Sequence, residues 1–266
     1  MPRMPRSIWN GTITFGLIAV PIKVHSATEG HAIHFHQVHE EDGARIKQKR
    51  ICTEEGREVP YEEVAMGYEV RGGEFVMLDK DEIDAAAGEP SRTIGLDQFV
   101  DRAEVDPVFY DRAYYLGAGK DGHDAYRLLH DALARSGRAG IGRWVFHNRE
   151  YLVAVRPIDD AGVLILHTMR FADELVADDK LDIPRPSRKP SDRELEMAER
   201  LVQSLQKPFR PGAFKDTYRD RVRELIARKA KGEEIELPEI EAPEAPGDLT
   251  AALEASLAGK KPNGKR

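Results

Sequence analysis

The stretch Gly142-Arg-Trp-Val-Phe-His-Asn-Arg-Glu-Tyr-Leu-Val-Ala-Val-Arg-Pro157 decides the fold class. It contains two runs rich in β-branched and aromatic residues, joined through Asn148-Arg149, and this composition is typical of a strand hairpin. A third run of the same kind, Val163 to Met169, follows closely. Together the three runs predict a β-sheet over this part of the chain.

Outward from this stretch, short strands continue to outnumber helices. A helix is predicted over residues 122–136 from its apolar spacing, and Gly137 and Gly140 are interpreted as its stop. The other expected elements are two strands with a bend in 8–24, strands over 32–39, 45–50, 92–100 and 108–116, two strand-like pieces around Gly72-Gly73, and a short helix over 79–87. This pattern predicts a mainly β protein with some α-helix, either an all-β barrel or an α+β domain.

The composition changes after Asp182, where a proline-rich connector leads into two predicted helices. Ser191 with Glu194 forms a capping-box sequence, so one helix is expected from there to about residue 206, and a second over 216–231. Each has an apolar stripe that must be buried against the same chain or a partner. The stripes comprise Leu195, Ala198, Leu201, Val202 and Leu205, and Tyr218, Val222, Leu225 and Ile226. We therefore expect a core over residues 1–182, a helical segment over 183–232 and a flexible tail over 233–266.

Charge is strongly segregated along a chain whose formal net charge is −7. Residues 51–111 carry 5 basic against 17 acidic side chains, whereas residues 185–232 carry 14 against 7. The tail is first acidic, then has a short amphipathic piece over 249–257, and ends in a basic arm containing Lys260, Lys261, Lys265 and Arg266. Local fields therefore matter more than the net charge, and an acidic chain of this kind remains compatible with nucleic-acid binding.

The segment Arg45-Ile-Lys-Gln-Lys-Arg50, called here the basic run, is the most concentrated positive charge in the N-terminal half. As a strand it would place Arg45, Lys47 and Lys49 on one face. Cations aligned in this way repel one another unless an anionic partner lies along them, and a nucleic-acid backbone is the commonest such partner. The alternative is a solvated edge strand protected from aggregation by its lysines.

The single cysteine, Cys52, excludes an intramolecular disulfide framework and fits a reducing compartment. No apolar segment has the length of a signal-peptide core or of a membrane span, so we expect no membrane association. The sequence thus predicts a cytoplasmic protein, or one associated with the nucleoid.

The sequence His34-Phe-His-Gln-Val-His39 is the one pattern suggestive of enzymatic chemistry. Its spacing is like the zinc motif of metallo-β-lactamase-type hydrolases, but Val38 occupies the position of a ligating aspartate, and alternation would place His39 opposite His34 and His36. A zinc-dependent hydrolase remains the enzyme alternative. Phosphate-binding loops, dinucleotide fingerprints and nucleophile elbows are missing from the sequence. We therefore expect a binding protein, with no enzymatic activity and no cofactor.

Five segments in order resemble bacterial Ku, the DNA-end-binding protein of non-homologous end joining, over roughly residues 6–232. The matching segments are Trp9-Asn-Gly-Thr-Ile-Thr-Phe-Gly-Leu-Ile-Ala-Val-Pro21, His34 to Arg45 with Cys52, Gly140-Ile-Gly-Arg143 with Glu150-Tyr-Leu152 and Arg156-Pro157, Leu166-His-Thr-Met-Arg-Phe-Ala-Asp-Glu174, and Tyr218-Arg-Asp-Arg-Val-Arg-Glu-Leu-Ile226. The resemblance implies a homodimer with a β-barrel core and a strand-rich bridge. Its two copies together form a ring that duplex DNA enters from an end. It also implies recruitment and stimulation of an ATP-dependent ligase, ligase D.

The resemblance also implies roles for particular residues. It places the basic run in the bridge, so Arg45, Lys47, Lys49 and Arg50 become candidates for lining the bore, together with Lys23 and Arg143. It assigns the two C-terminal helices to an arm that embraces the partner, through Leu195, Leu201, Leu205, Tyr218, Val222 and Leu225. The basic tail residues Lys260, Lys261, Lys265 and Arg266 are candidates for an additional DNA contact.

Overall fold

The computed structural model describes residues 6–86, 92–158, 161–177, 180–181, 189–233 and 249–257. The chain divides into two units, residues 1–180 and 181–266. The predicted boundary between residues 182 and 183 lies outside the described residues, as do the basic tail residues Lys260, Lys261, Lys265 and Arg266.

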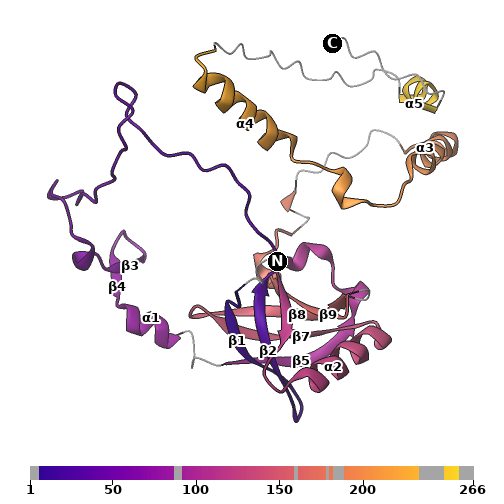
Figure 1. Cartoon of the computed structure of the whole chain (residues 1–266), viewed down its shortest axis with the longest axis horizontal. Coiled ribbons are helices and arrows are strands. Elements are labelled where there is room, and N and C mark those ends of the chain that lie inside the picture. The colour runs from indigo at the N-terminus through magenta and orange to yellow at the C-terminus, as the bar shows by residue number, and fades with distance from the viewer. Residues whose placement is uncertain are drawn as a thin grey trace. The chain divides into compact units, whose positions relative to one another are not determined.

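Seven strands of the first unit close into a barrel in the order β1-β2-β6-β9-β8-β7-β5 (Figure 1). Neighbouring strands pair antiparallel, except that β1 and β5 pair in parallel where the barrel closes. The strands are β1 (Trp9–Phe15), β2 (Ile18–Ser26), β5 (Thr93–Asp101), β6 (Tyr110–Ala118), β7 (Arg138–Phe146), β8 (Arg149–Ile158) and β9 (Val163–Met169). The predicted α+β fold with a β-barrel is confirmed.

The barrel interior is filled by one hydrophobic cluster centred on the buried Trp144. Its indole ring stacks on Phe146 at 4.4 Å and meets the rings of Trp9 and Tyr114 edge-on at 5.6 and 5.5 Å. Because aromatic side chains bury large apolar areas, this cluster contributes strongly to the stability of the barrel.

The predicted helix at 122–136 is confirmed as α2 (His123–Ser136), which packs against β8, β2 and β7. Tyr126 fixes its position, since the hydroxyl donates to the carbonyl of Leu116 at 2.6 Å and accepts from the amide of Leu164 at 2.7 Å. Burial raises the pKa of this hydroxyl. The helix ends at Gly137, whose φ of 67° gives the left-handed cap that glycine favours.

Between β2 and β5 lies a long excursion with few regular elements (Figure 1). It contains the 3₁₀ turn η1 (Tyr61–Glu63), the hairpin β3 (Met66–Glu69) with β4 (Phe75–Leu78), and α1 (Lys80–Ala86). The strands predicted over 32–39 and 45–50 are wrong, because these segments make only one isolated bridge, Val38 with Arg45. Alternation alone could not produce strands there, since pairing between the two segments does not extend beyond this bridge.

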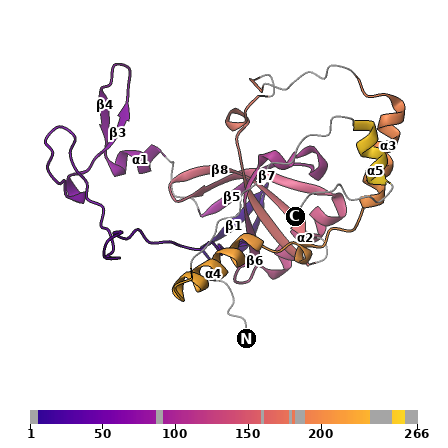
Figure 2. The ribbon, with the colours of Figure 1, turned by 90° about the horizontal axis from the view of Figure 1, so that it is seen from above.

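In the second unit both predicted helices are confirmed, as α3 (Asp192–Leu205) and α4 (Thr217–Ala230). The capping box is present, with the Ser191 amide donating to the Glu194 carboxylate at 2.8 Å. The short amphipathic piece is α5 (Leu249–Leu257), which lies beside α3 (Figure 2), and Arg193 pairs with Glu254 at 3.3 Å. Much of the apolar stripes remains exposed, including Leu195, Leu205, Tyr218 and Leu225.

His167 on β9 makes the stability of the barrel dependent on pH. Burial, aided by the nearby positive charge of Arg156, lowers the pKa of His167 from 6.5 to about 4. The unfolded chain therefore binds a proton at this imidazole at a higher pH than the folded chain does. We expect this contribution to stability to be complete above about pH 6.5 and to be lost progressively as the pH falls to about 4.

Urea unfolding at several pH values between about 7 and 4 measures this effect. Replacing His167 by glutamine, a neutral side chain of similar polarity, should remove the part of the pH dependence that His167 causes. An identical pH dependence in wild type and variant would show that other groups are responsible.

Candidate nucleic-acid interface

The basic run connects two small hairpin loops of the excursion, and all six of its residues are exposed. In the first loop the amide of His39 donates to the carbonyl of Ala44 at 2.8 Å, next to the bridge between Val38 and Arg45. Asp42 closes the turn by accepting from the amide of Ala44 at 2.9 Å. That bond and the contact with His39 lower the pKa of the Asp42 carboxyl. The turn predicted at Asp42-Gly43 is thus present, with Gly43 at a φ of 69°.

The second loop reverses the chain immediately after the basic run. The amide of Val59 donates to the carbonyl of Arg50, and the amide of Cys52 to the carbonyl of Arg57, both at 2.9 Å. These bonds flank the bridge between Ile51 and Glu58. The loop therefore brings the acidic residues that follow the basic run back alongside its end.

The cations of the basic run differ in the partners they have. Arg45 and Lys47 form no ion pair with any residue that the structure describes, so both are available to an external anion. Lys49 pairs with Glu58 at 2.6 Å, and the guanidinium of Arg50 lies 5.1 Å from the ring centre of Tyr61. All four cations are exposed, and their contact with DNA stays a prediction. The pairing of Lys49 was not predicted.

Lys23 and Arg143 lie on the barrel strands β2 and β7, outside the excursion that carries the basic run. Lys23 is exposed. Arg143 is also exposed but pairs with Glu150 on β8 at 2.9 Å. These two positions thus stay predictions, and the Arg143 guanidinium already has one carboxylate partner.

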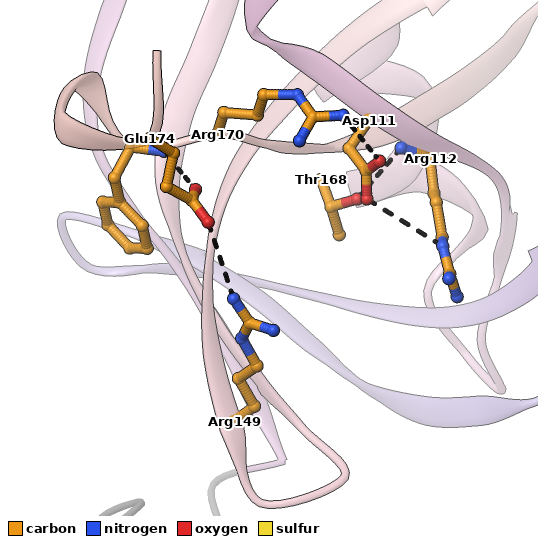
Figure 3. Close-up of polar contacts among 7 residues, drawn as sticks. Asp111, Arg112, Arg149, Thr168, Arg170 and Glu174 are labelled. Carbon is orange, nitrogen blue, oxygen red and sulfur yellow. Dashed lines mark hydrogen bonds and ion pairs between the residues drawn. The ribbon is translucent and has the colours of Figure 1, made fainter. Parts of the chain in front are cut away.

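Arginines that the sequence interpretation did not single out gather at one end of strands β6, β8 and β9 (Figure 3). Asp111 lies between two of them, 3.4 Å from Arg170 and 3.9 Å from Arg112, while Arg149 approaches Glu174 at 3.7 Å. Glu174 is held by the amide of Phe171 at 2.8 Å.

Three exposed guanidinium groups have carboxylate partners here: Arg112 and Arg170 pair with Asp111, and Arg149 pairs with Glu174. An open cavity of about 640 Å³ borders this cluster, lined in part by Asp111 and Arg112. In the sequence, only Arg170 and Glu174 could have indicated this cluster, since both lie within one of the matching segments. Arg112 and Arg149 are brought close to them by the pairing of β6 with β9 and of β9 with β8.

The histidine pattern does not form a metal centre in the part of the chain that the structure describes. His34 and His36 are exposed, and His39 bonds the carboxylate of Asp42 at 3.1 Å. No group of three histidine, cysteine or acidic side chains among the described residues is arranged to hold a metal ion. The hydrolase alternative therefore has no ligand set in this region.

None of the helices that the structure describes is both long and apolar enough to cross a membrane.

Comparison with known proteins adds an independent finding. Residues 14–197 match the family model described as the Ku70/Ku80 beta-barrel domain. The chain is 43% identical to the non-homologous end joining protein Ku of Anaeromyxobacter sp. (strain K), over 98% of this chain and 88% of that protein. It is 38% identical to the protein of the same name from Mycobacterium tuberculosis, over 95% of this chain and 94% of that protein. It is 35% identical to the one from Solibacter usitatus, over 99% of each.

Proposed function

The chain belongs to the Ku family of non-homologous end joining proteins, and from this premise we propose that it binds the ends of double-stranded DNA during repair of double-strand breaks. In this proposal it acts as a homodimer that encircles the duplex and reads no sequence. It recruits and stimulates an ATP-dependent ligase, ligase D, and has no enzymatic activity of its own. It works in the cytoplasm, on the nucleoid.

The observation that carries the proposal is the exposure of Arg45 and Lys47, in a chain whose net charge is negative. Neither side chain has a carboxylate partner within the described part of the chain. Cations presented on irregular, exposed backbone suit the phosphate backbone, which offers the same charge at every base pair. Such contacts position a protein on DNA without distinguishing sequences. A ring also needs no tight local contact, because its topology retains the DNA.

The test of this function compares linear duplex DNA with covalently closed circles of the same sequence. We expect the protein to retard the linear form in a gel-shift assay and to leave the circle free, because a closed ring can be entered only from an end. Cutting the circle once should restore binding. Equal binding of linear and circular forms would contradict threading and favour a protein that coats nucleic acid generally.

The homodimer is supported by the apolar stripes of the second unit. Tyr218 and Leu225 lie on one side of α4 and are 65% and 37% exposed, which is uncommon for a face with no partner. We propose that these residues, with Val222 and with Leu195, Leu201 and Leu205 of α3, pack against the second copy. The basic tail residues Lys260, Lys261, Lys265 and Arg266 stay a prediction of additional DNA contact.

Replacing Leu225 by glutamate should weaken the dimer by about tenfold, because a charge would enter an apolar interface. Sedimentation equilibrium across a range of protein concentrations measures the dissociation constant. The matched control is Ala227→Glu, which introduces the same charge at an exposed position on the opposite side of α4. Equal weakening by both variants, or by neither, would remove this stripe from the dimer interface.

A further inference from the structure

Glu58 forms an ion pair with Lys49 of the basic run, whereas Lys47 has no carboxylate partner among the described residues. Its carboxylate lies 2.6 Å from the ammonium of Lys49. The bridge between Ile51 and Glu58 fixes this approach, because Lys49 lies two residues before Ile51 and therefore on the same side of the hairpin. Side chains in this diagonal relation across an antiparallel pair are within reach of each other.

The ion pair is exposed on both sides, since 66% of the Lys49 side chain and 53% of the Glu58 side chain are accessible. Exposed pairs of this kind contribute little to stability and exchange partners readily. A phosphate oxygen has the same charge and the same acceptor chemistry as the Glu58 carboxylate. Glu58 thus competes with DNA for the ammonium group of Lys49. The bridge between Ile51 and Glu58 keeps Glu58 in position to do so.

We infer that Glu58 lowers the affinity of the protein for DNA by competing with phosphate for Lys49. The inference rests on the proposed function and deepens it, because it identifies a residue that sets how strongly the basic run holds the duplex. A ring held by topology benefits from weak local contacts, since each additional phosphate contact would slow its movement along the DNA.

The neighbouring acidic side chains do not act in the same way. Glu55 and Glu63 both pair with Arg57, which lies outside the basic run. Glu62 is exposed and forms no ion pair within the described part of the chain, so it contributes only to the general negative field of this segment. The competition is therefore specific to Glu58 and Lys49.

The experiment measures binding to a short linear duplex as a function of salt concentration for wild type, Glu58→Gln, Lys49→Ala and the double variant. Glu58→Gln should bind about two- to fivefold more tightly, the range expected when one exposed ion pair is removed. Its salt slope should become steeper by about 0.9, because one more phosphate is neutralised. In the Lys49→Ala background the same change should produce neither effect.

Glu62→Gln is the matched control, because it removes the same charge four residues away. It should change the affinity less than Glu58→Gln does and leave the salt slope unchanged. A gain that persists without Lys49, a similar gain in Glu62→Gln, or weaker binding by Glu58→Gln would each overturn the inference. Failure of the wild type to bind linear duplex at all would overturn the proposed function as well, so the two failures are distinguishable.

Discussion

Replacing Gly142 by alanine should destabilise the barrel by about 3 kcal/mol, and lower its melting temperature by about 10 °C, as expected for forced overpacking in a domain of this size. A Cβ atom at Gly142 would overlap the carbonyl oxygen of Gly95 on β5. It would also lie 2.7 Å from the carbonyl carbon of Gly95 and 2.8 Å from the Cα of Leu96. All of these are backbone atoms, so no side-chain rotation can relieve the clash. The β5–β7 ladder would have to separate at this point.

Gly95→Ala is the matched control, because it makes the same substitution on the facing strand of the same ladder. A Cβ at Gly95 would meet no atom within 4 Å, so its stability should change little. Thermal unfolding followed by circular dichroism measures both variants. Similar melting temperatures for the two would show that β5 and β7 can move apart without cost, contrary to the packing described above.

These glycines also show where a sequence stops predicting the fold. Gly137 and Gly140 were both interpreted as the stop of the helix, and only Gly137 has that role. Gly140 lies within β7, where a Cβ would approach a methyl carbon of Leu96 at 2.8 Å. The sequence does not distinguish a glycine that ends a helix from one that leaves room for the side chain of a neighbouring strand. Which role a glycine has depends on the packing of a segment that is distant in the sequence.

The regular elements were predictable where local signals agree with tertiary packing. The helix α2 and the strands β7 to β9 combine a local pattern with a buried face or a paired neighbour, and α3 begins at the capping box of Ser191. The basic run had the alternation of a strand but no strand pairing beyond a single bridge, so the strand prediction failed there.

For the candidate site, the sequence identified the cations but not their partners. Exposure of Arg45, Lys47, Lys49 and Arg50 followed from their charge, because uncompensated cations are rarely buried. The pairing of Lys49 with Glu58 depends on the loop at residues 51–58, and the arginine cluster around Asp111 depends on three adjacent strands. Residue types alone could not determine either arrangement.

The combined replacement of Arg45, Lys47 and Lys49 by alanine should weaken binding to linear duplex by about 30-fold at 0.15 M salt, because each phosphate contact contributes about fivefold through counterion release. The loss should be the same for duplexes of different sequence, since phosphate contacts carry no sequence information. The salt slope should fall by about 1.8, the value for two contacts, because Glu58 already holds Lys49.

The matched control removes three exposed cations on and beside α2, through Lys120→Ala, Arg127→Ala and Arg135→Ala. It changes the net charge by the same amount at positions that we do not place in the interface, so it should leave the slope unchanged. The slope therefore separates direct contact from long-range attraction, which the affinity alone cannot do. A slope that falls equally in both triple variants would mean that the total charge, and not the basic run, governs binding. A fall of about 2.7 would mean that Lys49 also reaches a phosphate, so that Glu58 releases it when DNA is bound.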